Sequence, residues 1–100
     1  MKIIWSPLAL ERIKEISEYI SRDNLSAAEN WVLTIFEKVK KLQDFPQIGR
    51  VVPEVERHEI RELIYGKYRI LYRISEDFIS ILTVRHGRQL LDLDEIIQGN

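Results

Sequence analysis

The sequence has 100 residues, which suffice for one core but not two, so we expect a single domain over residues 1–100. Apolar residues make up 45% and charged residues 31%, which excludes a disordered chain, and the net charge of −1 excludes the broad positive field of a general nucleic-acid binder. Cysteine is absent and histidine occurs twice, so we expect no disulfide, metal or cofactor. No apolar run approaches the roughly 20 residues of a membrane span, and we expect a cytoplasmic protein without a membrane partner.

Residues 2–5 are expected to form a short strand, and Ser6 followed by Pro7 predicts the start of a helix. A serine side chain can accept hydrogen bonds from the first free N–H groups, and proline fits the first helical position. Apolar residues then recur at steps of three and four, the period of an amphipathic helix of about four turns. These residues are Ala9, Ile13, Ile16 and Ile20.

A second helix is expected after a turn at residues 21–25. The stretch from Ser26 to Glu29 matches a capping box, in which Ser26 caps the helix start and Glu29 reaches back. Pro46 disfavours a helical residue before it, so this helix should end near Asp44. The two helices would form an antiparallel hairpin. The apolar face of the second helix contains Ala28, Trp31, Val32, Ile35, Phe36, Val39 and Leu42.

After a loop at residues 45–53, the apolar period changes to that of strands. Residues 59–65, 68–74 and 78–85 are expected to form three strands, joined by short connections that suit antiparallel pairing. A last helical turn is expected within residues 92–98. The central strand has one face with Tyr68, Ile70, Tyr72 and Ile74 and another with Arg69, Leu71 and Arg73.

The order β-α-α-β-β-β predicts an α+β domain in which the helical hairpin covers one face of an antiparallel sheet. The Tyr/Ile face is the more apolar of the two and should face the helices. The other face would then be partly open and would carry Arg69 and Arg73. Arg61 and Arg85 could join them, but the sequence does not give the register of the strands.

Arginine is concentrated in the later part of the chain. Residues 47–91 contain eight basic and six acidic residues, and seven of the eight basic residues are arginine. The planar guanidinium can bind carboxylates or phosphates through paired N–H groups. The same pattern also fits arginines that form cross-strand ion pairs with neighbouring glutamates, and both interpretations stay open here.

Several segments, in order along nearly the whole chain, resemble the RelE/ParE superfamily of toxins from bacterial and archaeal toxin–antitoxin pairs. Each segment alone has low specificity, whereas the ordered set is a strong signal. The fold that the resemblance implies, two helices packed on an antiparallel sheet, agrees with the layout above. The segments are Ser6-Pro7 and residues 45–50 (FPQIGR), 52–54 (VPE), 60–63 (IREL), 68–74 (YRILYRI) and 81–88 (ILTVRHGR).

The resemblance implies a growth-inhibiting toxin, typical of plasmid stabilisation, that a cognate antitoxin neutralises. Toxins like ParE inhibit DNA gyrase, whereas toxins like RelE cleave mRNA at the ribosome. The ending at residues 84–88 is similar to that of ParE and favours gyrase inhibition by binding. Arg50, Arg85 and Arg88 are then the candidate residues for binding the target or the partner. A family member that has lost toxicity and only binds its partner is a third possibility.

The alternative, an mRNA endonuclease, needs groups that move protons and stabilise phosphate charge. By the resemblance, Arg69 occupies the place of a phosphate-stabilising arginine, with Arg73 and Arg61 as further candidates and His86 as the acid or base. Two features of RelE-like nucleases are missing. Their lysine pair would fall near Ile60 and Glu62 here, and no aromatic residue follows Phe78. Glu54 and His58 are further titratable candidates, of which His58 lies in a charged stretch and is expected to be solvated.

Four leucines fall outside the two apolar helix faces and could remain exposed in the isolated chain. The resemblance implies a groove that the C-terminal segment of an antitoxin fills, and these leucines are candidates for its lining. They are Leu8, Leu10, Leu25 and Leu33.

Overall fold

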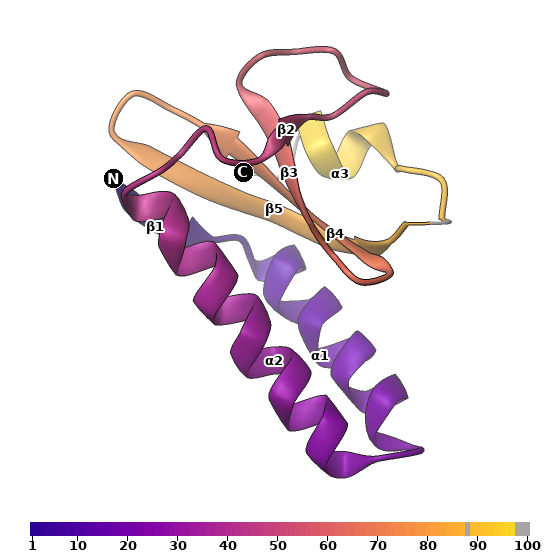
Figure 1. The fold of residues 1–100 in the computed structure, drawn as a ribbon. Coiled ribbons are helices and arrows are strands. Elements are labelled where there is room, and N and C mark those ends of the chain that lie inside the picture. The colour runs from indigo at the N-terminus through magenta and orange to yellow at the C-terminus, as the bar shows by residue number, and fades with distance from the viewer. Residues whose placement is uncertain (88, 98–100) are drawn as a thin grey trace.

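The computed structural model describes residues 1–87 and 89–97 and places a pair of helices against one sheet (Figure 1). The α+β class and the order of the expected elements are confirmed, with one additional strand, β2. No helix in the described part of the chain is long and apolar enough to cross a membrane. The elements are β1 (Lys2–Trp5), α1 (Pro7–Ser21), α2 (Leu25–Lys40), a 3₁₀ turn (Lys41–Gln43), β2 (Arg50–Val51), β3 (Ile60–Tyr65), β4 (Tyr68–Ile74), β5 (Phe78–His86) and α3 (Leu93–Ile97).

The strands form one mixed sheet in the order β1-β5-β4-β3-β2. As expected from the short connections, β3, β4 and β5 pair antiparallel. The first strand instead pairs parallel with β5, so that Lys2 lies opposite Phe78 and Trp5 opposite Ile81. The helical hairpin carries the chain from β1 to the far edge of the sheet, and the meander from β2 to β5 then returns to the side of β1.

The two long helices begin at polar caps. At the start of α1, Ser6 acts as expected, because its Oγ accepts a hydrogen bond from the N–H of Ala9 at 3.0 Å. The expected cap of α2 is wrong: Asn24, not Ser26, accepts from the N–H of Ala27 at 3.0 Å, and Ser26 already lies within the helix. Asparagine is as good a cap as serine, and the extended backbone of Asn24 allows the helix to begin earlier.

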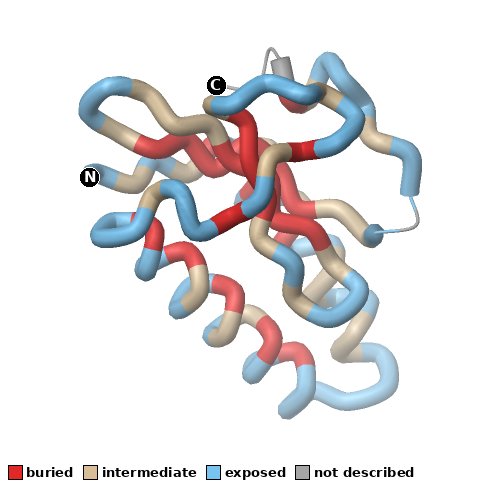
Figure 2. The backbone as a smooth tube through the Cα atoms, turned by 45° about the horizontal axis from the view of Figure 1, so that its top comes forward, coloured by how far each residue is buried: buried red, intermediate tan, exposed pale blue. Residues whose placement is uncertain are grey.

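The main core lies between the helices and the sheet, and the buried residues recur along α2 on the side that faces the strands (Figure 2). The Tyr/Ile face of β4 points into this core, as expected, with Ile70 and Tyr72 fully buried. The Tyr72 hydroxyl donates to the C=O of Pro46 at 2.8 Å and accepts from the N–H of Gly49 at 2.9 Å. These bonds fasten the loop before β2 to the centre of the sheet.

A second, smaller core covers the other face of the sheet. It combines residues of the strands with Val52 from the loop after β2 and Ile96 from α3. All of its buried members have no exposed surface, so the face that the sequence analysis expected to be partly open is packed in this region. The difference arises because α3 and the loop after β2 fold back over the sheet, which strand periodicity does not predict. The buried members are Val52, Ile60, Leu71, Leu82 and Ile96.

The strand register decides which arginines share a face. Arg69 lies directly opposite Arg85, and Arg73 lies on the same face four residues further along β4. Arg61 lies opposite Tyr72 and therefore points to the helix side of the sheet, away from the other three. The register between β4 and β5 shifts between Leu71 and Tyr72, because Leu71 pairs with Thr83 whereas Tyr72 pairs with Ile81.

Candidate functional site

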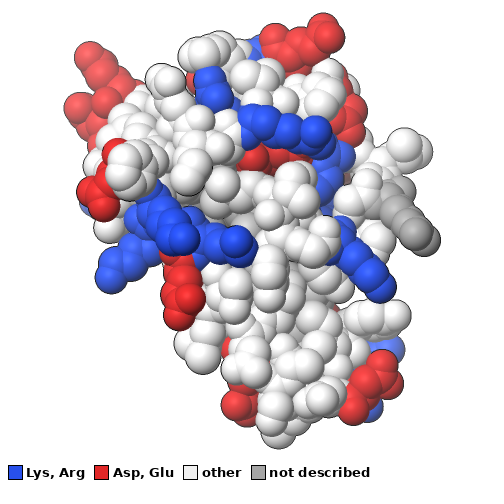
Figure 3. Space-filling view, in the orientation of Figure 1, with Lys and Arg blue, Asp and Glu red and all other residues white. Residues whose placement is uncertain are grey.

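An ion-pair cluster occupies the position where the resemblance places phosphate chemistry. Arg69, on β4, has a side chain that is only 8% exposed, and its Nε donates to Glu62 on β3. Its two other nitrogens donate to the two oxygens of Glu54, at 2.8 and 3.0 Å. Glu62 is fully buried and also accepts from Arg50 at 2.6 Å. Figure 3 shows basic and acidic side chains in contact over the β2–β3 edge of the sheet.

The charges of this cluster hold one another in the ionised state. The Arg69 guanidinium lowers the pKa of Glu54 from 4.5 to about 2, and the hydrogen bonds to Glu54 and Glu62 raise the pKa of Arg69 above its ordinary value. An arginine stabilises a phosphate by offering it paired N–H groups. In Arg69 all three nitrogens already donate to carboxylates. To bind a phosphate, Arg69 would have to break its hydrogen bonds to at least one of the two carboxylates.

A second ion-pair cluster attaches α3 to the rest of the fold. Glu95 of α3 bridges Arg12 of α1 and Arg85 of β5, with a separation of 3.1 Å from Arg85. The guanidinium of Arg73 lies close by and donates to the C=O of Ile96 at 3.4 Å. Arg85 and Arg73 are therefore in contact with the C-terminal helix. Arg85 is a candidate binding residue, and in this state much of its side chain is engaged within the fold.

Arg61 is buried on the helix side of the sheet and contacts backbone rather than carboxylates. Its guanidinium donates to the C=O of Gly49 at 2.9 Å and to the C=O of His58 at 3.1 Å. The ring of His58 lies against the same guanidinium at 3.2 Å. Arg61 thus ties together the two loops that flank β2. A guanidinium that satisfies buried carbonyl groups serves the fold directly.

His86 ends β5 and faces a different part of the molecule. Its ring packs edge-on against Tyr68, with 5.5 Å between the ring centroids. Together with Lys67 and with Tyr19 of α1, these residues line a hollow of about 340 Å³. The neighbouring residue on β5, Arg85, points to the opposite side of the sheet. The structure therefore brings Arg69, Arg73 and Arg85 to one face, whereas Arg61 and His86 lie elsewhere.

Two predicted residues and two that the sequence did not predict complete the site. Arg50, a candidate binding residue, is 60% exposed at its side chain, and Arg88 lies outside the described residues. The buried Glu62 and the α3 residue Glu95 were not predicted as partners of the arginines. The signal for Glu62 is a single carboxylate between Ile60 and Ile64 on one face of a strand, whereas nothing in the sequence places Glu95 beside Arg85.

The described residues contain no group of three or more histidine or acidic side chains that could hold a metal ion. In the two ion-pair clusters, the titratable groups are oppositely charged side chains already joined by hydrogen bonds. Such pairs stabilise each other's charged state, whereas proton transfer at neutral pH needs a group whose pKa lies near the working pH. The cluster is therefore suited to charge recognition and to holding the fold rather than to proton transfer.

Comparisons with known proteins identify relatives along almost the whole chain. The family described as the ParE toxin of the type II toxin–antitoxin system parDE matches residues 3–91. Putative toxin Y4kP of Sinorhizobium fredii is 39% identical over 90 residues, which are 88% of this chain and 90% of Y4kP. Toxin RelE2 of Caulobacter vibrioides is 26% identical over 90 residues, which are 89% of this chain and 98% of RelE2.

A solved structure adds a likeness in three dimensions. The chromosomal ParDE TA system from P. aeruginosa contains a chain with a TM-score of 0.70 and 25% identity, covering 86% of this chain and 95% of that chain. The fold comparison and the two toxin relatives agree with the family match over residues 3–91. The resemblance to the RelE/ParE superfamily is thereby confirmed, and this chain belongs to the ParE toxin family of type II toxin–antitoxin systems.

Proposed function

We propose that this toxin inhibits growth by binding DNA gyrase, and that a cognate antitoxin neutralises it by binding the toxin. The observation that carries the choice of a binding mechanism is the state of Arg69. Both carboxylates that engage it are held by several hydrogen bonds, and one of them is fully buried. Removing one partner from a buried ion pair costs about 3–5 kcal/mol. Recruiting Arg69 to a phosphate would therefore oppose the stability of the fold.

The positions next to Arg69 also favour binding over RNA cleavage. Ile60 and Glu62 stand near the places where RelE-like nucleases have lysines, and both are buried. Ile60 packs in the second core, and Glu62 is a carboxylate that neutralises the arginines beside it. Neither side chain can supply the positive charge that a cleaved phosphate needs. The alternative function, ribosome-dependent mRNA cleavage, would therefore have to work without basic side chains at these two positions.

An antitoxin partner is supported by the likeness to the ParDE TA system and by the exposed apolar surface. Leu33 and Phe36 of α2 are exposed, as are Phe45 and Ile48 in the loop that follows. Leu10 and Leu25 are exposed as the sequence suggested, whereas Leu8 is only half-buried. We infer that a partner segment with apolar side chains covers part of this surface in the neutralised complex.

The target is tested by inducing the toxin without its antitoxin while DNA and protein synthesis are followed by pulse-labelling. We expect DNA synthesis to stop first while translation continues. A supercoiling assay with purified gyrase and the purified toxin should then show inhibition that depends on toxin concentration. If protein synthesis falls within minutes and DNA synthesis follows late, mRNA cleavage replaces gyrase binding as the function. If neither falls, the chain is a non-toxic member that only binds its partner.

A pair of matched variants locates the gyrase contact. Arg50→Ala removes an exposed arginine at the β2 edge, and Arg57→Ala removes an equally exposed arginine whose pair with Glu59 is also exposed. If Arg50 belongs to the binding surface, its loss should weaken gyrase inhibition roughly tenfold, as expected for a charge-assisted contact. The Arg57 variant should inhibit gyrase like the unchanged toxin. Equal effects of both changes would show that only the net charge matters.

A further inference from the structure

The hollow that contains His86 has walls of two kinds. On one side, α1 contributes Ile16 and the largely exposed ring of Tyr19. On the other side lie Lys67, at the turn between β3 and β4, and the rings of Tyr68 and His86. The volume of about 340 Å³ falls in the lower part of the range for sites that bind small molecules.

The aromatic walls are held in place from behind. The ring of Tyr68 packs edge-on against Trp31, with 5.2 Å between the centroids, and against His86 on its other side. Burial raises the pKa of the Tyr68 hydroxyl, so this group remains a neutral hydrogen-bond donor at physiological pH. Tyr19, by contrast, presents an exposed ring. A flat aromatic ligand could stack on such a ring without displacing a core residue.

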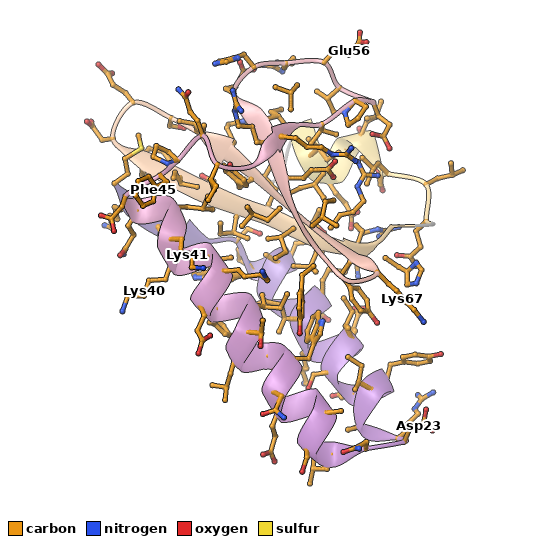
Figure 4. The ribbon with its side chains drawn as sticks, in the orientation of Figure 1. Asp23, Lys40, Lys41, Phe45, Glu56 and Lys67 are labelled. Carbon is orange, nitrogen blue, oxygen red and sulfur yellow. The ribbon has the colours of Figure 1, made fainter. Side chains whose placement is uncertain are left out.

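The charges around the hollow favour an anion at its outer end. Lys67 is exposed at the tip of the β3–β4 turn, as labelled in Figure 4. The guanidinium of Arg22 lies 5.9 Å from the ring centroid of Tyr19 and adds a second cation at this side. Glu15 also lines the hollow, but its carboxylate is engaged by Arg12 at 3.0 Å. Arg12, which Glu15 shares with Glu95, offsets part of the negative charge of Glu15 beside Lys67.

The backbone around the hollow is already ordered for binding. The N–H of Gly87 donates to the C=O of Lys67 at 2.6 Å, which joins the end of β5 to the β3–β4 turn. The N–H of His86 donates to the side chain of Gln89 at 3.1 Å, and the N–H of Gln89 returns a bond to the C=O of His86 at 3.0 Å. A ligand would therefore meet a preformed site, which lowers the entropic cost of binding.

We propose that this hollow binds a nucleotide, with its base stacked on Tyr19 and its phosphate bound by Lys67. An aromatic platform beside a cation is the combination that recognises a base together with its phosphate. The nucleotide can be free or can be one exposed unit of a single strand, because both present the same chemistry. The proposal goes beyond gyrase inhibition and does not depend on it.

The test is an NMR titration of the full-length, ¹⁵N-labelled toxin with AMP, adenosine and inorganic phosphate. We expect saturable shifts of the amides at Tyr19, Lys67, Gly87 and Gln89 with AMP, weaker binding of adenosine, and no matching shifts with phosphate alone. The absence of saturable shifts at millimolar AMP would overturn the proposal. So would shifts that centre on the lysines at the end of α2, or phosphate shifts equal to those of AMP.

Two variants with matched controls locate the binding groups. Lys67→Ala and Tyr19→Ala should each weaken AMP binding roughly tenfold, through the lost charge-assisted contact and the lost stacking respectively. Lys40→Ala and Phe45→Ala remove an equally exposed lysine and aromatic ring outside the hollow and should leave the affinity unchanged. All four side chains are exposed, so the spectra should match elsewhere. Equal weakening by the controls would refute the assigned site.

The same titration distinguishes the two sources of the nucleotide. A tetranucleotide that binds with the affinity of AMP would identify a free nucleotide as the ligand, since only one unit contacts the protein. A tetranucleotide that binds at least tenfold more tightly, with additional shifted amides next to the hollow, would identify a single strand. Both results require that Lys67→Ala weakens binding. Tetranucleotide binding that this change leaves intact would contradict the proposal.

Discussion

Replacing Arg69 by methionine tests whether the cluster at the centre of the sheet holds the fold or serves a substrate. The methionine keeps most of the apolar stem of the arginine but leaves Glu62 fully buried with one remaining partner, Arg50. Breaking a buried ion pair costs about 3–5 kcal/mol. Because Arg50 still donates to Glu62 at 2.6 Å, we expect a loss of about 3 kcal/mol, at the lower end of that range.

The assay is equilibrium unfolding in urea, supported by thermal unfolding. For a domain of this size, a loss of about 3 kcal/mol lowers the midpoint temperature by about 15 °C. Arg57→Met is the control, because its pair with Glu59 is exposed on both sides and should contribute less than about 1 kcal/mol. The double variant Arg69→Met with Glu62→Gln removes the stranded charge and should recover part of the loss.

The stability and the toxicity of the Arg69→Met variant together decide between the two roles. If Arg69→Met costs less than about 1 kcal/mol and yet abolishes toxicity, Arg69 acts on the target, and the ion-pair cluster is not the reason for its position. If toxicity falls only in proportion to the folded fraction, the cluster serves the fold. The stability measurement and the growth assay together therefore separate the structural role of Arg69 from a catalytic one.

Three further changes probe other parts of the fold. The Arg69 guanidinium lowers the pKa of Glu54 from 4.5 to about 2, so this carboxylate stabilises the fold above pH 4.5 and loses its effect as the pH falls towards 2. Glu54→Gln should flatten this decline in the free energy of unfolding, measured by urea unfolding at stepped pH. The change should be only about 1 kcal/mol, because the Glu54 side chain is half exposed. Gly49→Ala would place a Cβ 2.6 Å from the Tyr72 hydroxyl and should cost about 2 kcal/mol in the same assay, whereas an unchanged midpoint would contradict the packing of this loop. Glu95→Gln weakens the ion pairs that hold α3 and should speed amide hydrogen exchange in α3 without changing that of β4; equal rates before and after would show that its apolar contacts suffice.

The local parts of the fold could be predicted because they depend on neighbouring residues. The cap at Ser6 and the alternation along β4 both follow from short-range chemistry, and both occur in the structure. The parallel pairing of β1 with β5 could not be predicted in the same way, because it joins residues about 76 positions apart. A strand as short as β2 has too few residues to show a period.

The sequence predicted those features of the candidate site that depend on neighbouring residues, but not those that depend on strand register or on distant elements. Alternation along β4 correctly placed Arg69 and Arg73 on one face. Which face Arg61 occupies depends on the register between β3 and β4, and a shift of one residue would have reversed the answer. The carboxylates that engage the arginines lie on other elements. Glu54 comes from a loop and Glu95 from the C-terminal helix, so their proximity follows only from the complete fold.

The arginines differ in how readily a binding partner could recruit them, and the structure ranks them. Arg50 is largely exposed, and if it leaves Glu62 the buried carboxylate still has Arg69. Withdrawing Arg50 therefore costs about as much as breaking a surface ion pair, at most about 1 kcal/mol. Withdrawing Arg69 would leave the buried Glu62 with the exposed Arg50 as its one ion-pair partner. Arg85 lies between these extremes, because its partner Glu95 keeps Arg12. Contacts with the target or the antitoxin should therefore use Arg50 first, and Arg69 last.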